Sequence, residues 1–292
     1  MGALRAGSIL AGFFALTIPL MPVQAVLLGI SPRAARRFPH WYHRQVCRLI
    51  GVDLAIEGQL AADRPVLLVS NHTSWLDIPV LSAVAPVSFI AKKEVASWPF
   101  VSWLARLQRT VFVDRTTREA AGDATDEIMS RLSSGDTVVL FAEGTSSDGN
   151  RVLPFKTSLF GAVMPNKPTD ASTAALVQTC AVVYTHRYGI PIGRADRPGV
   201  GWYGDMEMQS HAWALLKSGP LRATIRIGPP VPLQSFVDRK ALALSNEREI
   251  RRAVIEILRG HQGQAPLQPV EPGAESRKQA ATIRAPGQDK WT

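Results

Sequence analysis

A histidine and an aspartate five positions apart are the residues in this sequence best suited to chemistry. His72 and Asp77 follow a short apolar run. Imidazole exchanges a proton near neutral pH, and a carboxylate on its second nitrogen fixes the tautomer and stabilises the imidazolium. Such a pair can serve as a general base toward a hydroxyl group. Two unrelated surface residues can show the same spacing, so the rest of the chain has to support the assignment.

Three further polar clusters follow apolar runs in the same way. They are Lys92, Lys93 and Glu94; Asp114 and Arg115; and Glu143, Gly144 and Thr145. Each run has the composition of a buried strand, so all four clusters lie just past the carboxyl end of an expected strand. In α/β sheets, ligands bind in the crevice at that edge. The clusters therefore predict one pocket that combines a base, its orienting carboxylate, several cations and hydrogen-bonding groups.

The elements expected to position these clusters alternate between strands and helices. Apolar, β-branched runs predict strands at residues 66–69, 87–91, 110–113, 137–141, 176–184 and 222–228. Helices are predicted at residues 40–50, 75–84, 118–132 and 247–259, and in a stretch that ends at residue 107. Asn246 and Glu249 match a capping box for the last helix. The alternation predicts an α/β fold with a central, mostly parallel sheet flanked by helices.

The N-terminal 50 residues combine an apolar segment with a basic one. Residues 7–30 carry no charge and are long enough to cross a hydrocarbon core of about 30 Å as a helix. Arginines follow without any acid, at Arg33, Arg36, Arg37, Arg44 and Arg48. This pattern is typical of a cytoplasmic flank and attracts anionic lipid head groups. We expect a membrane anchor, either a spanning helix or a proline-broken hairpin, because the segment fits a cleaved signal peptide poorly.

Composition narrows the partners that this chain can have. Its 292 residues can bury the core of one large domain. The net charge of +9 is compatible with nucleic acid, an anionic membrane or an anionic substrate. We do not expect nucleic acid, because the sequence has no zinc-finger spacing, RNP-like strand or lysine-rich arm. Cys47 and Cys180 lack metal-site spacing, so we expect two reduced thiols.

The ordered clusters resemble the lysophosphatidate acyltransferase family of glycerolipid acyltransferases. The first motif of the family, N-H-x4-D, is matched by Asn71, His72 and Asp77. The second motif, an apolar strand that closes on an aspartate and an arginine, is matched by residues 111–115. Both motifs occur in the order that the family requires.

The third family motif, F-P-E-G-T-R-S, is matched by residues 141–147, which read Phe-Ala-Glu-Gly-Thr-Ser-Ser. The following Phe155 and Lys156 also fit the family pattern. The resemblance extends over about residues 40–230. It implies a glycerolipid acyltransferase-like domain at residues 51–261, after a membrane segment and basic helix at residues 1–50. Residues 262–292, rich in Pro, Gly and charge, are predicted to form a disordered tail.

The family resemblance implies acyl transfer within a ternary complex. His72 would take the proton of the acceptor hydroxyl as its oxygen attacks an acyl thioester, and Asp77 would orient His72. The remaining candidates would contact the acceptor: Lys92, Lys93, Arg115, Glu143, Gly144, Thr145 and Lys156. No covalent acyl-enzyme, metal ion or bound cofactor is implied. The implied co-substrate is a thioester of acyl carrier protein or coenzyme A.

Two departures from the family pattern bear on the acceptor. Ser146 stands where the family usually has an arginine, and residues 177–183 lack the proline of the fourth motif. Without that arginine, a bidentate phosphate partner is missing. One branch of the family acylates lyso-ornithine lipid, whose acceptor is a 3-hydroxyl and whose head group is ornithine. Residues 140–160 and 202–206 resemble that branch, so we narrowly favour lyso-ornithine lipid over lysophosphatidate.

The resemblance also implies a place and partners for the enzyme. We expect it at the bacterial inner membrane, among membrane lipids, with the catalytic domain on the cytoplasmic face. Of two other function classes, the first is not expected and the second stays open. A serine hydrolase built on Ser146 would need a G-x-S-x-G elbow, which the sequence lacks. A non-catalytic membrane protein that binds lipid would not need the pair of His72 and Asp77.

Overall fold

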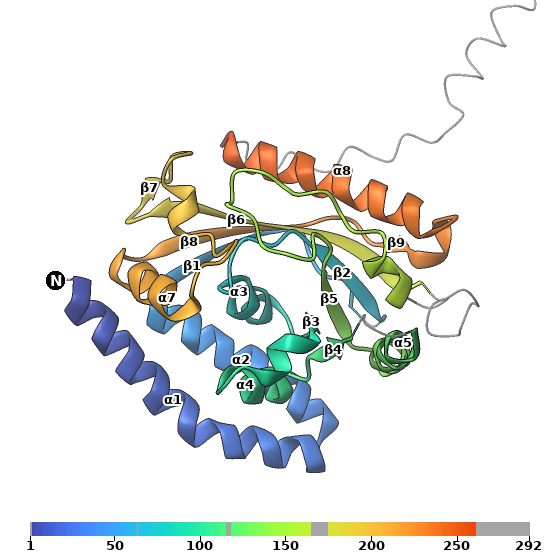
Figure 1. Cartoon of the computed structure of the whole chain (residues 1–292), viewed down its shortest axis with the longest axis horizontal. Coiled ribbons are helices and arrows are strands. Elements are labelled where there is room, and N and C mark those ends of the chain that lie inside the picture. Colours follow the sequence, from blue (N-terminus) through green and yellow to red (C-terminus); the bar gives the residue numbers. More distant parts are fainter. Residues whose placement is uncertain (1, 63, 115–117, 165–174, 261–292) are drawn as a thin grey trace, which may run out of the picture.

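The computed structural model describes residues 2–62, 64–114, 118–164 and 175–260, which are organised around a mixed sheet (Figure 1). The strands are β1 (Val52–Glu57), β2 (Val66–Ser70), β3 (Val87–Lys92), β4 (Val111–Val113), β5 (Thr137–Phe141), β6 (Leu176–Arg187), β7 (Ile190–Pro191), β8 (Leu221–Ile227) and β9 (Val231–Pro232). They lie in the order β1-β8-β6-β2-β5-β3-β4, while β7 and β9 pair with β6.

Helices cover both faces of this sheet. They are α1 (Gly2–Ile30), α2 (Pro32–Ile50), α3 (Asp77–Val84), α4 (Val101–Leu107), α5 (Arg118–Ser133), α7 (Met208–Lys217) and α8 (Arg239–Leu258), with short 3₁₀ turns η1 (Lys93–Ser97), η2 (Leu159–Ala162), η3 (Arg197–Gly199) and η4 (Leu233–Ser235). One core cluster joins the sheet to α5 and α8, and another joins it to α1, α2, α3 and α7 (Figure 1). The predicted α/β fold with flanking helices is confirmed.

The strands that carry the polar clusters run parallel to one another. β2 pairs in parallel with β5 and β6, and β3 pairs in parallel with β5 and β4. Every residue of β2 and β5 is buried, as expected for strands covered on both faces. The carboxyl ends of β2, β3, β4 and β5 therefore meet at one edge of the sheet. Antiparallel pairing is found where β8, β7 and β9 join β6.

Two helices begin earlier than the sequence patterns predict. α8 begins at Arg239, because the Asp238 side chain accepts hydrogen bonds from the backbone N–H groups of Lys240 (2.8 Å) and Ala241 (2.7 Å). Asn246, predicted as the cap, is instead buried inside this helix and donates to the Leu242 carbonyl oxygen. The predicted capping box is therefore wrong, since a better cap lies upstream.

α2 begins at Pro32 rather than at residue 40, although Pro39 lies inside it. A proline cannot donate the backbone hydrogen bond to the carbonyl four residues earlier. Here the Gln24 side chain supplies that donor, since its Nε2 lies 2.9 Å from the Ala35 carbonyl oxygen. A side chain from a neighbouring helix thus makes the proline tolerable.

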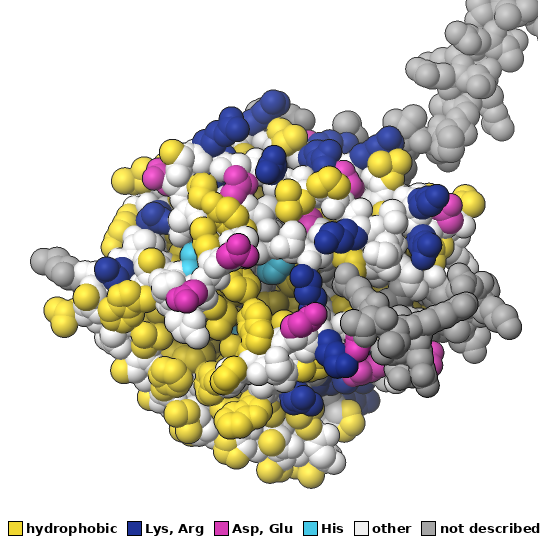
Figure 2. Space-filling model, in the orientation of Figure 1, with side chains coloured by type: hydrophobic (Ala, Val, Ile, Leu, Met, Phe, Trp, Pro, Cys, Tyr) yellow, Lys and Arg dark blue, Asp and Glu magenta, His cyan; other side chains and the backbone are white. Residues whose placement is uncertain are grey.

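α1 is one continuous helix through Pro19 and Pro22, so a hairpin broken within residues 7–30 is wrong. By length and composition, α1 could cross a membrane. Much of its apolar surface has no protein cover, including Ile18 and Ile30, which are 59% and 72% exposed. In Figure 2, hydrophobic side chains gather over the part of the surface that α1 forms in Figure 1. The predicted tail, residues 262–292, lies outside the described residues.

Candidate active site

The turn between β2 and α3 brings His72 and Asp77 together. His72 follows the end of β2, and Asp77 is the first residue of α3, where the helix dipole favours a negative charge. His72 Nδ1 lies 2.8 Å from Asp77 Oδ2. A carboxylate only accepts hydrogen bonds, so Nδ1 carries the proton and Nε2 keeps its lone pair in the neutral ring. This is the protonation pattern that a general base requires.

Asp77 is fully buried, and both of its oxygens are hydrogen-bonded. Oδ2 also accepts from the backbone N–H groups of Thr73 (2.7 Å) and Ser74 (3.0 Å). Oδ1 accepts from the Tyr184 hydroxyl at 2.6 Å. These donors hold the carboxylate in one orientation, and with it the ring of His72.

Tyr184 is a site residue that the sequence pattern did not indicate. It lies in β6, where its position suggests an ordinary core residue, and it is 4% exposed. Burial raises the pKa of Tyr184 well above its usual value, and the neighbouring Asp77 adds to this effect. The hydroxyl therefore stays protonated and acts as a donor to Asp77.

Glu143 occupies the loop after β5 but faces inward. Its Oε1 accepts from the His72 backbone N–H at 2.8 Å, and its Oε2 accepts from the Leu153 backbone N–H at 2.7 Å. Burial raises the pKa of Glu143 to about 8, although both N–H groups act in the opposite direction. Glu143 thus joins the loop of His72 to the loop of Leu153. This geometry favours a structural role, rather than the head-group contact expected from sequence.

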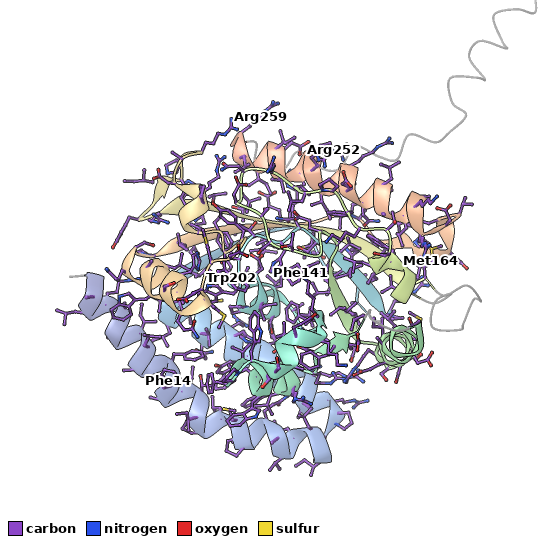
Figure 3. The ribbon with its side chains drawn as sticks, in the orientation of Figure 1. Phe14, Phe141, Met164, Trp202, Arg252 and Arg259 are labelled. Atoms are coloured by element: carbon purple, nitrogen blue, oxygen red, sulfur yellow. The ribbon has the colours of Figure 1, made fainter. Side chains whose placement is uncertain are left out.

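Two aromatic rings and two backbone contacts fix the remaining surroundings of His72. Its ring stacks on Phe141 with centroids 4.1 Å apart, and Phe89 stacks behind Phe141 at 6.0 Å (Figure 3 labels Phe141). The His72 carbonyl accepts from the backbone N–H of Ser147 at 2.9 Å. Asn71 exchanges hydrogen bonds of 2.9 and 2.8 Å with the backbone of Val182 in β6. Motifs one and three are thus joined through His72 itself.

The lysines of the expected pocket differ in their surroundings. Lys93 forms an ion pair of 2.6 Å with Asp114, which raises the pKa of Lys93. Lys92 is exposed and lines the cavity described next. The chain of Lys156 lies over Gly144, whose φ of +67° and close contact with that chain disfavour any larger residue. Arg115 lies outside the described residues.

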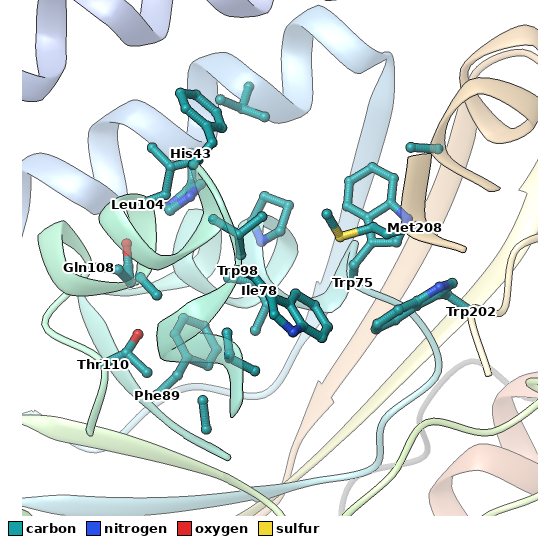
Figure 4. Close-up of a pocket in the computed structure, with 18 of the residues that line it drawn as sticks. His43, Trp75, Ile78, Phe89, Trp98, Leu104, Gln108, Thr110, Trp202 and Met208 are labelled. Carbon is teal, nitrogen blue, oxygen red and sulfur yellow. The ribbon is translucent and has the colours of Figure 1, made fainter. Parts of the chain in front are cut away.

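A cavity of about 1330 Å³ opens beside His72, between the sheet edge and helices α1, α2, α4 and α7. Its lining is mostly apolar and aromatic (Figure 4). The candidate residues in its wall are His72, Lys92, Gly144 and Thr145. Of the other described candidates, Asp77 and Glu143 lie buried beneath it, while Lys93 and Lys156 do not line it. The structure thus places His72 in the wall of a largely apolar chamber.

Neither the acids nor the thiols offer an evident metal site. Across the described residues, no group of three or more His, Cys, Asp or Glu side chains is placed to hold an ion. Cys47 and Cys180 are buried free thiols, and burial raises the pKa of each to about 12. Such thiols are protonated and unreactive at neutral pH.

Comparisons with known proteins show which family the chain resembles. A family model named Acyltransferase matches residues 52–181. The lyso-ornithine lipid O-acyltransferase of Brucella abortus is 45% identical over 262 residues, which cover 90% of this chain and 98% of that protein. The 1-acyl-sn-glycerol-3-phosphate acyltransferase of Neisseria gonorrhoeae is 32% identical over 211 residues, or 71% of this chain and 78% of that protein.

A solved structure supports the fold independently. The crystal structure of the 1-acyl-sn-glycerophosphate acyltransferase from Thermotoga maritima superposes with a TM-score of 0.61. It covers 91% of this chain and all of that one, at 23% identity, and so shows a shared fold. Acyltransferases of this family generally need no cofactor, and the apolar α1 is consistent with association with a membrane. The chain belongs to the glycerolipid acyltransferase family introduced above, and it is an enzyme that transfers acyl groups.

Proposed function

We propose that this enzyme acylates the free hydroxyl of lyso-ornithine lipid, with an acyl thioester of acyl carrier protein or coenzyme A as donor. The observation that carries the chemistry is the His72–Asp77 pair, 2.8 Å apart at the wall of the apolar cavity. Nδ1 is held by Asp77, so Nε2 is the nitrogen that can accept a proton.

The proposed reaction is a single displacement through a tetrahedral intermediate. His72 Nε2 removes the proton of the acceptor hydroxyl as its oxygen forms a bond to the thioester carbonyl carbon. Asp77 stabilises the imidazolium that results. The intermediate then expels the thiolate, which takes the proton from His72 and leaves as a thiol. The products are the ester and the free thiol, and no acyl-enzyme forms.

Ser146 supports the choice of acceptor. Its hydroxyl donates to the Trp202 carbonyl oxygen, so the position lacks both the charge and the free donors of an arginine. A phosphate monoester carries about −1.5 to −2 charges at pH 7 and binds best to several guanidinium or ammonium groups. The relative at 45% identity, named for lyso-ornithine lipid, points the same way. Lysophosphatidate is the alternative acceptor, because Lys92 and Lys156 could still contribute to a phosphate site.

The proposed location is the cytoplasmic face of a bacterial inner membrane. The exposed apolar side chains of α1 would contact the acyl region of the bilayer, and the arginines that follow would face anionic head groups. Acyl chains could then enter the apolar cavity beside α1 without crossing water. Arg36 is an exception among these arginines, because it forms an ion pair of 2.8 Å with Asp136.

The decisive experiment compares acyl transfer by membranes that carry wild-type or His72→Ala protein. We expect His72→Ala to lose about 10²–10⁴-fold in rate, as for removal of a general base. His186→Ala is the matched control, because His186 lies in β6 outside the cavity wall. Equal rates for His72→Ala and wild type would contradict the mechanism and favour a lipid-binding protein without turnover.

A further inference from the structure

The mouth of the cavity carries one positive and one negative side chain. Among the described residues that line the cavity, Lys92 and Glu94 alone are charged at neutral pH apart from any protonated histidine. They lie two positions apart, at the end of β3 and the start of η1, and both are exposed. Neither forms a close ion pair with another described residue. Lys93 between them is paired with Asp114 and interacts with Glu94 only at longer range. The wall is otherwise apolar or neutral, so these two charges are open to a ligand.

Tryptophan side chains line the same cavity as this pair of charges. Trp98, directly after η1, meets Trp202 edge to face with ring centroids 6.0 Å apart. Both rings line the cavity, and Figure 4 shows Trp75 turned toward the same space. The face of an indole ring attracts an ammonium ion, and an adjacent carboxylate strengthens that attraction.

Trp202 is held in place through its backbone and its ring nitrogen. Its N–H donates to the Thr73 carbonyl oxygen at 2.9 Å, and its Nε1 donates to the Met206 carbonyl oxygen at 2.8 Å. Its own carbonyl accepts from the hydroxyl of Ser146. Thr73 directly follows His72 in the chain. Ser146 directly precedes Ser147, whose backbone N–H donates to the His72 carbonyl oxygen. The aromatic wall is therefore fixed relative to the catalytic histidine.

We propose that this mouth is a binding site for a zwitterionic head group. The ammonium group of the acceptor lies between Glu94 and the rings of Trp98 and Trp202, and its carboxylate meets Lys92. The inference rests on the proposed lyso-ornithine acceptor and assigns the residues that select it. An ornithine with one acylated amino group keeps one ammonium and one carboxylate, both charged at pH 7. One free lysine and one free glutamate match those charges.

A phosphate head group fits this mouth less well. Among the described residues of the cavity wall, a group of about two negative charges would face one lysine, Lys92, and would lie near the carboxylate of Glu94. The neutral Ser146 provides no compensating charge, and its hydroxyl is already bonded to Trp202. Glu94 therefore works against lysophosphatidate as well as for an ammonium group, which is how a binding site gains specificity.

The first test changes the lipid and leaves the protein intact. Wild-type membranes are offered lyso-ornithine lipid, its N-acetylated derivative without the ammonium charge, its methyl ester without the carboxylate, and lysophosphatidate. We expect kcat/KM to fall about tenfold for the N-acetylated lipid, because an ion pair and a cation–π contact are lost together. If the N-acetylated lipid is acylated as well as the parent, the ammonium site is wrong while the proposed function stands. If lysophosphatidate alone is acylated, the proposed function itself is wrong.

The second test asks whether Glu94 and Trp202 recognise the ammonium group of the lipid. Glu94→Gln and Trp202→Leu should each lower kcat/KM for the parent lipid several-fold and leave the N-acetylated lipid unaffected. Asp126→Asn and Trp41→Leu are the matched controls, because Asp126 is an exposed acid and Trp41 an exposed tryptophan outside the cavity wall. An equal loss on both lipids would show that these side chains act on folding or membrane contact, and would overturn the proposal.

Discussion

Two regions of the site are built on opposite principles. We call His72, Asp77 and Glu143 the corner, and we call the cavity lining formed by α1, α2 and α4 the wall. At the corner, the side-chain oxygens of Asp77 and Glu143 all accept hydrogen bonds, and Asp77 is fully buried. Along the wall, α1 exposes apolar side chains such as Phe14, which Figure 3 shows at its surface. A polar network has one satisfactory arrangement, whereas apolar contacts tolerate many. The protein thus combines a tightly bonded histidine–aspartate pair with an apolar helical surface.

The few polar contacts of the wall serve a different purpose. Gln24 Nε2 donates at 2.9 Å to the Ala35 carbonyl in α2 and at 2.9 Å to the Leu107 carbonyl in α4. The Thr17 hydroxyl lies 2.7 Å from the Tyr42 hydroxyl. Each contact joins one helix to another, and none reaches the catalytic pair. Polar groups therefore orient a reactive atom in the corner and attach helices in the wall.

The largest expected effect comes from Asp77→Asn, which replaces the carboxylate bonded to His72. An amide can donate to His72 Nδ1, so the ring can adopt the wrong tautomer and lose its basic nitrogen at the reacting side. We expect kcat to fall about 10³–10⁴-fold. The amide nitrogen must also face a donor that the carboxylate had accepted, so the melting temperature should drop. Asp53→Asn, at an exposed ion pair, is the control. A normal rate would show that Asp77 does not orient His72.

A smaller effect is expected from Tyr184→Phe, which removes one donor to Asp77 and leaves the ring in the core. The carboxylate then keeps its contacts with His72, Thr73 and Ser74 but can rotate more freely. We expect kcat to fall about tenfold with KM unchanged, which corresponds to about 1.4 kcal/mol in the transition state. Tyr188→Phe, at an exposed tyrosine, should leave both constants unaltered. A change in KM alone would instead indicate substrate contact.

The corner could be predicted from sequence as far as its contacts are local. His72 and Asp77 lie in one turn, and the strands before the clusters are continuous apolar runs, so short patterns were sufficient. Tyr184 could not be found in this way, because its contact with Asp77 joins β6 to a turn more than a hundred residues earlier. Residue type alone also does not show which way Glu143 faces, because its two bonds to the His72 and Leu153 backbone join separate loops. Its predicted contact with the acceptor stays a prediction.

The helices of the wall were predicted less well, because their boundaries depend on contacts with other helices and strands. A proline within α2 indicated a boundary, but Gln24 from α1 satisfies the carbonyl that Pro39 leaves free. β1 and α7 were missed, since their patterns are weak and their place is set by β8 and α1. Tertiary contacts thus decide helix boundaries that local propensity leaves open. The division of residues into membrane segment, catalytic domain and tail stays a prediction.

The third prediction uses the pH dependence of stability to test the burial of Glu143. Burial raises the pKa of Glu143 from 4.5 to about 8, so the folded protein holds a proton that the unfolded chain releases above pH 4.5. The stability from this proton is complete below about pH 4.5 and is lost as the pH rises to about 8, at up to about 1.4 kcal/mol per pH unit. Thermal unfolding in detergent should show this decline in the wild type. Glu143→Gln should flatten it, and an unchanged slope would mean that Glu143 is not the group responsible.

The smallest expected effect on catalysis is that of Gln24→Leu, which tests the wall. The substitution leaves the carbonyls of Ala35 and Leu107 without their donor, at a cost of about 1–3 kcal/mol for each buried group. Gln24 Oε1 is itself buried without a partner among the described residues, so its loss offsets part of that cost. We expect a net loss of about 2 kcal/mol, seen as a lower melting temperature and faster proteolysis between α1 and α2. The same assay on Gln59→Leu, an exposed glutamine, should show no change. Because none of these bonds reaches His72, kcat of the folded fraction should be retained, and a large fall in kcat would mean that wall and corner are coupled.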